Sequence, residues 1–427
     1  MSSIATHAHD SHHAPDYSHD PRFRESNIRA SGGSLSMLCL VVAVLGIGAT
    51  VAAAFAGPGK VHAMASFQAA AMGGLAICLG GMFFTLVMHL MAAGWSVTLR
   101  RQLENMMVLA PIMLIVASVV PLYDLFVGHG LLYTWMSPEF SGNVLLQKKA
   151  AFLNPSFFCV RLMIYFTLWS IIAWKMNGYS VRQDQTGDKW LTAQARFSSA
   201  WAMLVFALST AFCAFDLLMS LDFRFFSTMW GVYYFAATAF SSVAFLVLIV
   251  ASLRRVGKLE GLVNSEHFHD TGKLMFTFTV FWAYIAFSQY FLIWYSNIPE
   301  ETAWFLVRKQ HGWQYVFYLL CFGHFIAPFL ILLFRSVKRS YHALMLIAVW
   351  MIFINFTDMF FIVRPMVTTR DTVGETSPMS GLWVDFAAAL GVLGLLGFLV
   401  IRRMAKLPLV PTKDPRLPEA LHHANYV

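Results

Sequence analysis

The chain has 427 residues, of which 58% are hydrophobic and only 12% are charged, and its formal net charge is +8. A soluble globular domain carries about a quarter charged residues, so this composition excludes an ordinary soluble protein. The basic residues lie in short segments between long apolar runs. This pattern indicates membrane orientation and argues against a nucleic-acid partner.

The first 34 residues are polar and rich in histidine, with His7, His9, His12, His13 and His19. Histidine-rich tracts can bind metal, but no other potential ligand accompanies these side chains. We therefore expect residues 1–34 to form a disordered cytoplasmic tail. The tail does not have the pattern of a cleavable signal peptide, so we expect the first apolar segment to direct insertion.

Residues 35–405 contain ten apolar segments that are long enough to cross a bilayer as helices. None alternates polar and apolar residues as barrel strands do. We therefore predict an all-α polytopic membrane protein with about ten transmembrane helices. The predicted spans are Leu35–Gly57, Ser66–Gly94, Asn105–Gly128, Leu153–Met176, Phe197–Ser220, Met229–Leu253, Leu274–Asn297, Trp313–Phe334, Tyr341–Arg364 and Gly381–Arg403.

Most of the 30 Lys and Arg residues fall in segments on the same side as the N-terminal tail. The positive-inside bias therefore predicts that both termini are cytoplasmic, and an even number of spans requires the same. On the opposite side, residues 129–151 include Tyr133, Trp135 and Met136. This loop fits either an interfacial segment or a docking surface for a partner. Residues 406–427 contain four prolines and are expected to form a cytoplasmic arm that lies on a neighbour.

Ionisable side chains at membrane depth are the most informative residues. A charge at the bilayer centre costs about 2.5–3.5 kcal/mol, so such residues indicate a functional path by default. We expect acids near the outer ends of the third, fifth and ninth spans, and an arginine about 12 Å into the fourth. Histidine and tyrosine side chains lie near mid-membrane or on the inner side. The candidates for a proton path are Asp124, Arg161, Asp216, His324, Asp358, Tyr284, His89 and Glu104.

Simpler interpretations of these residues stay open. Asp124 and Asp216 could be hydrated at headgroup level, Arg161 could extend outward to water, and His324 could be a hydrogen-bonded core histidine. Arg161 could neutralise one carboxylate by ion pairing. His89 and His324 differ in depth by about half a membrane, which argues against a haem held between them. The five cysteines form no CxxC pair and no haem-attachment motif.

Several long stretches resemble the F-type membrane subunit of bacterial alternative complex III, a quinol:cytochrome c (or quinol:oxidase) oxidoreductase. The resemblance covers residues 35–405. Its motifs are Phe152–Phe158 leading to Arg161, Phe215–Asp222 with Phe226–Thr228 and Gly231–Tyr233, His267–Leu274, and Gln289–Tyr290 through Trp294–Thr302.

The resemblance implies two four-helix bundles with flanking helices, a fold shared with membrane subunits of polysulfide and nitrite reductase systems. It implies a bacterial cytoplasmic membrane and a path through Asp124, Arg161, Asp216, His324 and Asp358. No redox cofactor would be held firmly by this chain, although the complex uses menaquinol or ubiquinol. Expected partners are a homologous C-type membrane subunit, an iron–sulfur subunit, multihaem and monohaem cytochrome c subunits, small membrane subunits, optionally a terminal oxidase, and lipids.

The expected function is therefore a membrane subunit that provides a proton path coupled to quinol oxidation elsewhere in the complex. Direct quinone binding by this chain is one alternative; it needs a lipid-accessible pocket with a polar pair such as His plus Asp. A secondary transporter would bind its solute between broken helices at mid-membrane. A structural scaffold with inert charges is the remaining alternative.

Overall fold

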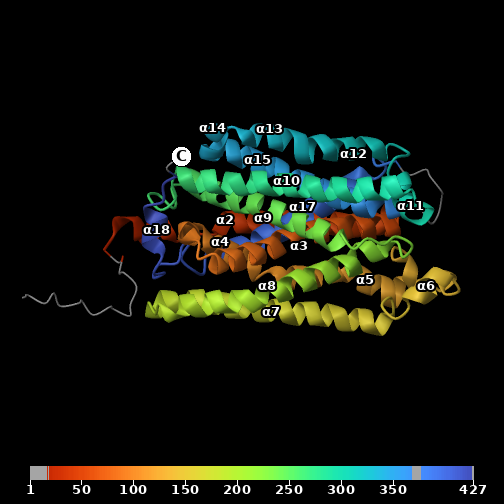
Figure 1. Ribbon diagram of the computed structural model, residues 1–427, viewed down its shortest axis with the longest axis horizontal. Coiled ribbons are helices and arrows are strands. Elements are labelled where there is room, and N and C mark those ends of the chain that lie inside the picture. The colour runs from red at the N-terminus through yellow and green to blue at the C-terminus, as the bar shows by residue number, and fades with distance from the viewer. Residues whose placement is uncertain (1–16, 18, 368–376, 426–427) are drawn as a thin grey trace, which may run out of the picture.

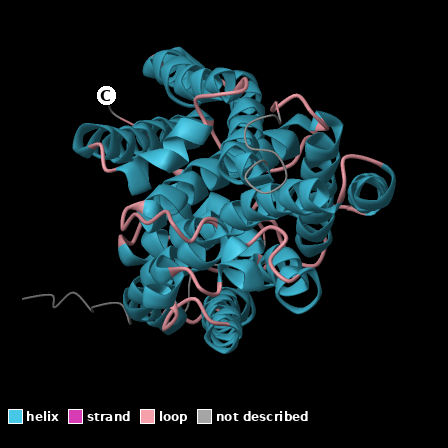
Figure 2. Cartoon of the chain, turned by 90° about the vertical axis from the view of Figure 1, so that its right-hand side faces the viewer, coloured by secondary structure: helices cyan, strands magenta, loops and turns pink. Residues whose placement is uncertain are grey.

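A computed structural model of the chain describes residues 17, 19–367 and 377–425. This part of the chain is helical with connecting loops, and no strand occurs in it (Figure 2). Ten of its helical segments are long and apolar enough to cross a bilayer, so the predicted all-α polytopic membrane fold is confirmed. Four of the five tail histidines, His7 to His13, lie outside the described residues.

The spans follow the predicted order, with ends that differ by a few turns. Two of the spans are interrupted. The third span breaks once and ends in a π-helical turn, and the eighth span contains a π-helical turn between two α-helices. The spans are α2 (Gly33–Ala56), α3 (Lys60–Leu90), α4 (Val97–Met107) with α5 (Ala110–Tyr123) and η3 (Asp124–Gly128), α7 (Pro155–Thr186), α8 (Trp190–Leu217), α9 (Trp230–Arg255), α10 (Ser265–Ser296), α12 (Trp313–Leu320) with η7 (Cys321–Ile326) and α13 (Ala327–Leu333), α15 (Tyr341–Val363), and α17 (Leu382–Met404).

Polar caps explain where several spans begin. The Asn154 side chain accepts a hydrogen bond from the Phe157 N–H at the start of α7, and Pro155 follows the cap. Asn264 caps α10 in the same way and forms a reciprocal capping box with His267. Because these side chains satisfy backbone N–H groups that have no partner inside the helix, the sequence sets these helix starts locally.

The spans form two bundles around a central helix pair. The first bundle contains α3, α4 with α5, α7 and α8, and the second contains α9, α10, α12 with α13, and α15. Helices α3 and α9 pack against each other and join the bundles, while α2 and α17 pair and flank α3. Figure 1 shows α7 and α8 on one side of the centre, with α12, α13 and α15 on the other.

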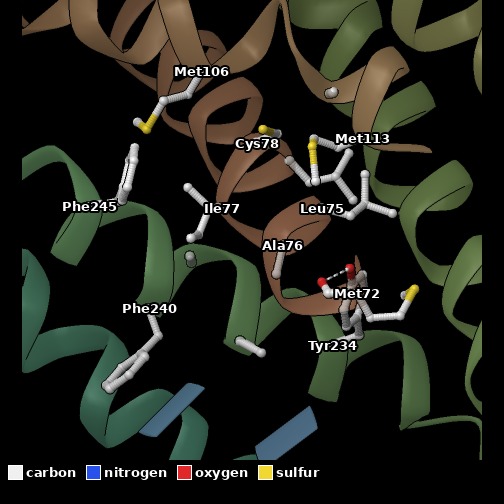
Figure 3. Packing of buried hydrophobic residues seen from close by; sticks show 14 of the residues in the cluster. Met72, Leu75, Ala76, Ile77, Cys78, Met106, Met113, Tyr234, Phe240 and Phe245 are labelled. Carbon is white, nitrogen blue, oxygen red and sulfur yellow. Dashed lines mark hydrogen bonds between the residues drawn. The ribbon is translucent and has the colours of Figure 1, made fainter. Parts of the chain in front are cut away.

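Small residues let the central helices approach closely. A side chain at Gly80 of α3 would collide with the Thr238 backbone of α9, and Gly46 of α2 meets Gly391 of α17 in the same way. Around these contacts the core is apolar, and Figure 3 shows α3 residues facing Met106, Met113 and α9. The Tyr234 hydroxyl donates to the Met72 carbonyl at 2.9 Å inside this core. The helix backbones approach closely here and provide the packing contacts that larger side chains would otherwise provide, as in other membrane bundles.

Both described ends of the chain lie at one end of the molecule. We call this the terminal end; it carries α1 (Glu25–Ile28) and α18 (Leu417–Leu421), whereas α6 (Val144–Lys149) and α11 (Pro299–Val307) lie at the opposite, distal end (Figure 1). A shared end for both termini agrees with an even number of spans.

Segments outside the spans pack more closely than we expected. In the predicted disordered tail, residues 21–28 form two short helices, and Leu259 N–H donates to the Asn27 carbonyl. In the distal loop, Leu132, Tyr133 and Trp135 are buried against the same chain and Met136 is partly buried, so the side chains of this loop pack mainly inside the molecule. The C-terminal arm, residues 405–425, folds back on its own chain. Its Leu409 N–H donates to the Ile28 carbonyl at 2.7 Å.

Candidate functional site

Arg161 and Asp216 form a closed ion pair inside the first bundle. The Arg161 guanidinium contacts both carboxylate oxygens, with Nε–Oδ2 at 2.8 Å and Nη2–Oδ1 at 2.7 Å. The Tyr165 hydroxyl donates to Oδ2 at 2.7 Å, and Arg161 Nη1 donates to the Phe152 carbonyl. The Phe152 ring lies 3.8 Å from the guanidinium carbon. These contacts satisfy both charges, so the predicted ion pairing is present but neither group faces an open path.

Asp124 holds the distal loop by accepting backbone N–H groups. Its Oδ1 accepts from Leu131 at 2.6 Å, and its Oδ2 accepts from Leu132 at 2.9 Å and Tyr133 at 2.7 Å. The chain can reverse at this point because His129 and Gly130 have φ angles of 52° and 83°, the second of which favours glycine. The carboxylate is fully buried. Its geometry therefore assigns a structural role to Asp124.

Asp358 has a different environment in the second bundle. Its Oδ1 accepts from the Tyr233 hydroxyl at 2.5 Å and its Oδ2 from the Trp282 indole N–H at 3.1 Å. The side chain is fully buried, and no cation of the described chain lies within ion-pair distance of it. A buried carboxylate without a counter-charge is costly, and Asp358 has two donors where Asp124 has three.

His324 stacks on a face of the same indole, whose edge N–H bonds to Asp358. Its ring stacks on Trp282 with centroids 3.6 Å apart and on Phe240 at 4.1 Å. The ring is fully buried, and in the described structure neither of its nitrogens has a hydrogen-bond partner. The residue sits in η7, a π-helical turn, and such turns are frequent at functional sites. The alternative of a hydrogen-bonded core histidine is not what the contacts show.

Two further polar side chains of the second bundle are also unsatisfied. Both amide atoms of Asn355, one turn before Asp358 on α15, lack a partner among the described residues. Gln289 lies two turns beyond Trp282 on α10, and its Oε1 is likewise unpartnered. Buried polar atoms are nearly always paired with protein or ordered water. This bundle therefore has a set of donors and acceptors that water could join. We call Tyr233, Trp282, Gln289, His324, Asn355 and Asp358 the second-bundle polar set.

Tyr284 does not belong to this set. Its side chain is 65% exposed on the outer face of α10, so the expectation that it lines the interior is corrected. In this part of α10 the buried residues are Trp282, Ile285 and Gln289. Both faces of α10 are apolar or aromatic. No polar face therefore indicates, from the sequence, which side of the helix is buried.

His89 and Glu104 lie in a buried charge cluster at the terminal end. Glu104 pairs with Arg100 at 3.2 Å and lies 3.5 Å from Arg101, which also contacts Asp184 at 2.5 Å. Asp414 of the C-terminal arm pairs with Arg100. We call these residues and their electrostatic neighbours the terminal cluster: His89, Arg100, Arg101, Glu104, Asp184, Arg403, Asp414 and Arg416.

The docking of the C-terminal arm is expected to depend on pH through Asp414. Burial alone would raise the pKa of this carboxyl, but Arg100 and Arg416 beside it hold the pKa at about 2. The folded pKa lies below the unfolded value of about 3.9. The ionised Asp414 carboxyl therefore stabilises the docked arm by about 2–3 kcal/mol above pH 4, and this stabilisation is lost as the pH falls toward 2. Limited proteolysis of the arm between pH 6 and pH 2.5 measures this. In Asp414→Asn, the change in cleavage over that window should be smaller, and any remainder reports the contacts of the arm with Asp184 and Asp270.

A groove of about 830 Å³ runs along the membrane-facing side of the second bundle, between α12, α15 and α17. Its lining is mostly apolar and aromatic, with Tyr315, Phe353 and Phe386 among the side chains. Asp385 lies at its distal end and pairs with Arg364 at 3.1 Å; it also accepts from Ser66 Oγ at 2.6 Å. The volume is in the range of small-molecule pockets.

A histidine lies behind the polar end of this groove. His62 Nε2 lies 3.7 Å from the Asp385 carboxylate and makes no hydrogen bond to the described chain. Asp385 lines the groove, whereas His62 is buried beside Asp385 and is not part of the lining. Sequence reasoning did not select either residue. The signal was available for Asp385, which is an acid in the first turn of the last span.

The other functional candidates missed from sequence are neutral or seemed to be surface charges. Tyr233 and Trp282 are ordinary aromatic residues in apolar runs, and only their contacts with Asp358 distinguish them. Arg100 and Arg101 were interpreted as loop charges, yet both are at most 1% exposed. Among residues 17, 19–367 and 377–425, no cluster of His, Cys, Asp or Glu could hold a metal ion. No protein-family model and no curated protein matches this chain.

Proposed function

We propose that this chain is a membrane subunit of a quinol-oxidising respiratory complex of the alternative complex III type, and that it carries protons through its second bundle. The observation that carries the proposal is Asp358, a fully buried carboxyl that contacts two neutral donors and no cation of the described chain. The motifs around Arg161, Asp216 and His267 support membership of such a complex. The excess of basic residues at the terminal end supports a cytoplasmic location for both termini.

In this proposal Asp358 is a group that gains and loses a proton. The Tyr233 hydroxyl and the Trp282 N–H would stabilise the carboxylate when the proton leaves, because hydrogen bonds to a charged acceptor are strong. His324 offers a second proton acceptor across the indole ring. Ionisation in a dry bundle is costly, so proton transfer requires water or a charge change nearby. Quinol oxidation in a homologous membrane subunit would supply that change.

The remaining partners follow from the same proposal. The electrons would pass to an iron–sulfur subunit and cytochrome c subunits outside this chain, which itself would hold no firmly bound redox cofactor. Moving one charge against 100 mV costs about 2.3 kcal/mol, so the path must be coupled to electron transfer. The first-bundle residues Asp124, Arg161 and Asp216 would then support the fold and not the path.

Asp358→Asn tests the proposal. The amide keeps the size of the side chain and can still accept from Tyr233 or Trp282, but it cannot release a proton. We expect proton transfer to slow by about 10²-fold or more, so that protons delivered per electron fall while haem and iron content stay unchanged. The measurement is a pH-sensitive dye in vesicles that contain the intact complex. Glu300→Gln, an exposed acid at the distal end, is the control. An unchanged proton yield in Asp358→Asn would rule out this path.

The groove beside α17 favours a second candidate, direct quinone binding. A quinol hydroxyl could donate to Asp385 and face His62, while the isoprenoid tail would lie along the apolar lining. A photoreactive quinone should then label peptides from α15 and α17, and Asp385→Asn should reduce the labelling relative to Glu300→Gln. Labelling that is absent, or equal in both variants, would exclude a quinone site at this position.

A further inference from the structure

The terminal cluster contains more unsatisfied polar atoms than a dry protein interior allows. Within the described chain, both ring nitrogens of His89, Nη1 of Arg100 and of Arg101, and Oδ1 of Asn105 have no hydrogen-bond partner. Each of these side chains is at most 3% exposed. Buried donors and acceptors in native proteins are satisfied by protein or by ordered water, each water making two to four hydrogen bonds. These atoms therefore point to a ligand that both donates and accepts.

The charges of the cluster point in the same direction. Four arginines, Arg100, Arg101, Arg403 and Arg416, lie beside three buried or part-buried acids, Glu104, Asp184 and Asp414. A fourth acid, Glu419, lies near Arg416 but is exposed. Ion pairing among the covered groups therefore leaves one guanidinium without a counter-charge. His89 lies within electrostatic range of Arg100, Arg416 and Asp414, so the uncompensated donors and the histidine share one region. A buried cation without a counter-charge is costly unless dipoles solvate it, and water supplies such dipoles.

The C-terminal arm is what covers this region. It crosses the terminal end from α7 to α10: Thr412 N–H donates to Asp184 at 2.9 Å, and His423 Nε2 lies 2.6 Å from Asp270. Between these points Asp414 contacts Arg100. The Leu409 N–H bond to the Ile28 carbonyl and the buried side chains of Leu409, Val410, Leu417 and Ala420 anchor the arm on either side of Asp414. The segment between these anchors is held by polar contacts, and those of Thr412 with Asp184 and of Asp414 with Arg100 can break without unfolding a span.

We propose that the terminal cluster is an internal water site and that the C-terminal arm is its removable cover. Water enters from the terminal side when the arm leaves Arg100, and it contacts His89 and Glu104. One part of this inference rests on the proposed function: if the chain carries protons, the water site is the terminal inlet of the proton path. The two tests of the water site measure only hydration and solvent exposure, so their failure is distinguishable from a failure of the path.

The first test uses the unmodified chain. A high-resolution cryo-EM map of the protein in lipid nanodiscs is expected to show ordered water within hydrogen-bond distance of His89 and Arg100. A map with well-defined side chains and no water density at either residue would overturn the water site. This measurement depends on no variant and on no proton transport.

The second test removes the main contact of the cover. In Asp414→Asn, and in a chain ending at Lys406, hydrogen exchange of the α4 amides Val97–Met107 is expected to accelerate about 10-fold or more. Glu260→Gln, an exposed acid at the same end, is the matched control. If α4 exchanges at the control rate in both variants, the arm is not a cover. If Asp358→Asn leaves the proton yield unchanged while these expectations hold, only the path fails.

Discussion

Arg161→Ala is expected to lower the free energy of unfolding by about 3–5 kcal/mol. The substitution leaves the Asp216 carboxylate fully buried, with the Tyr165 hydroxyl as the one side-chain donor that remains among the described residues. It also removes the donor to the Phe152 carbonyl and the stacking on the Phe152 ring. Unfolding in mixed micelles, followed by steric trapping or by tryptophan fluorescence, measures the change.

Two further variants separate the ion pair from general damage to α7. Arg182→Ala alters an exposed arginine on the same helix, whose guanidinium donates to the Gly178 carbonyl and lies 5.4 Å from the centre of the Tyr179 ring, and it should change stability by no more than about 0.5 kcal/mol. The double variant Arg161→Met with Asp216→Leu removes both charges and should recover most of the loss, because an apolar pair avoids the desolvation cost. If Arg161→Ala is as stable as Arg182→Ala, the stabilising role of the Arg161–Asp216 ion pair is contradicted.

Asp124→Ala is the second substitution with a large expected effect. It leaves the N–H groups of Leu131, Leu132 and Tyr133 without their acceptor in a buried turn. An unsatisfied buried donor costs about 1–3 kcal/mol. The turn can open to water at the distal end, so water can satisfy part of these groups. We therefore expect the free energy of unfolding to fall by about 3 kcal/mol in total. We also expect faster hydrogen exchange over residues 129–137.

Asp124→Asn should lie between the wild type and the alanine variant, because it keeps one carbonyl oxygen that can accept. Glu139→Ala, an exposed acid of the same loop, should leave both stability and exchange unchanged. Equal exchange in Asp124→Ala and Glu139→Ala would show that the loop does not depend on this carboxylate.

These two results would separate the two bundles by role. Toward the distal end of the first bundle, Asp124, Arg161 and Asp216 are satisfied by fixed partners, either a guanidinium or backbone N–H groups, whereas His89 and Glu104 at its terminal end keep atoms without a partner in the described chain. In the second bundle Asp358 lacks a counter-charge and His324 has no hydrogen-bond partner in the described chain. Groups that are fully satisfied have no reason to exchange protons. The asymmetry therefore supports a proton path through the second bundle.

The sequence alone determined the fold class and the approximate positions of all ten spans. Hydrophobic length decides whether a segment crosses a bilayer, and this property is local. It also placed Arg161 and Asp216 at compatible depths, since depth follows from the rise along each helix. The cap residues Asn154 and Asn264 were likewise available in the sequence, although only as local signals.

Only the tertiary structure decided how the ionisable residues are used. Helix rotation turned Tyr284 outward and Trp282 inward, because a helix with two apolar faces carries no signal of its phase. The acceptor role of Asp124 depends on backbone N–H groups, which every residue type except proline provides. Arg100 became buried because the C-terminal arm, more than 300 residues later in the chain, supplies Asp414. Such contacts join distant segments, and composition and spacing do not encode them.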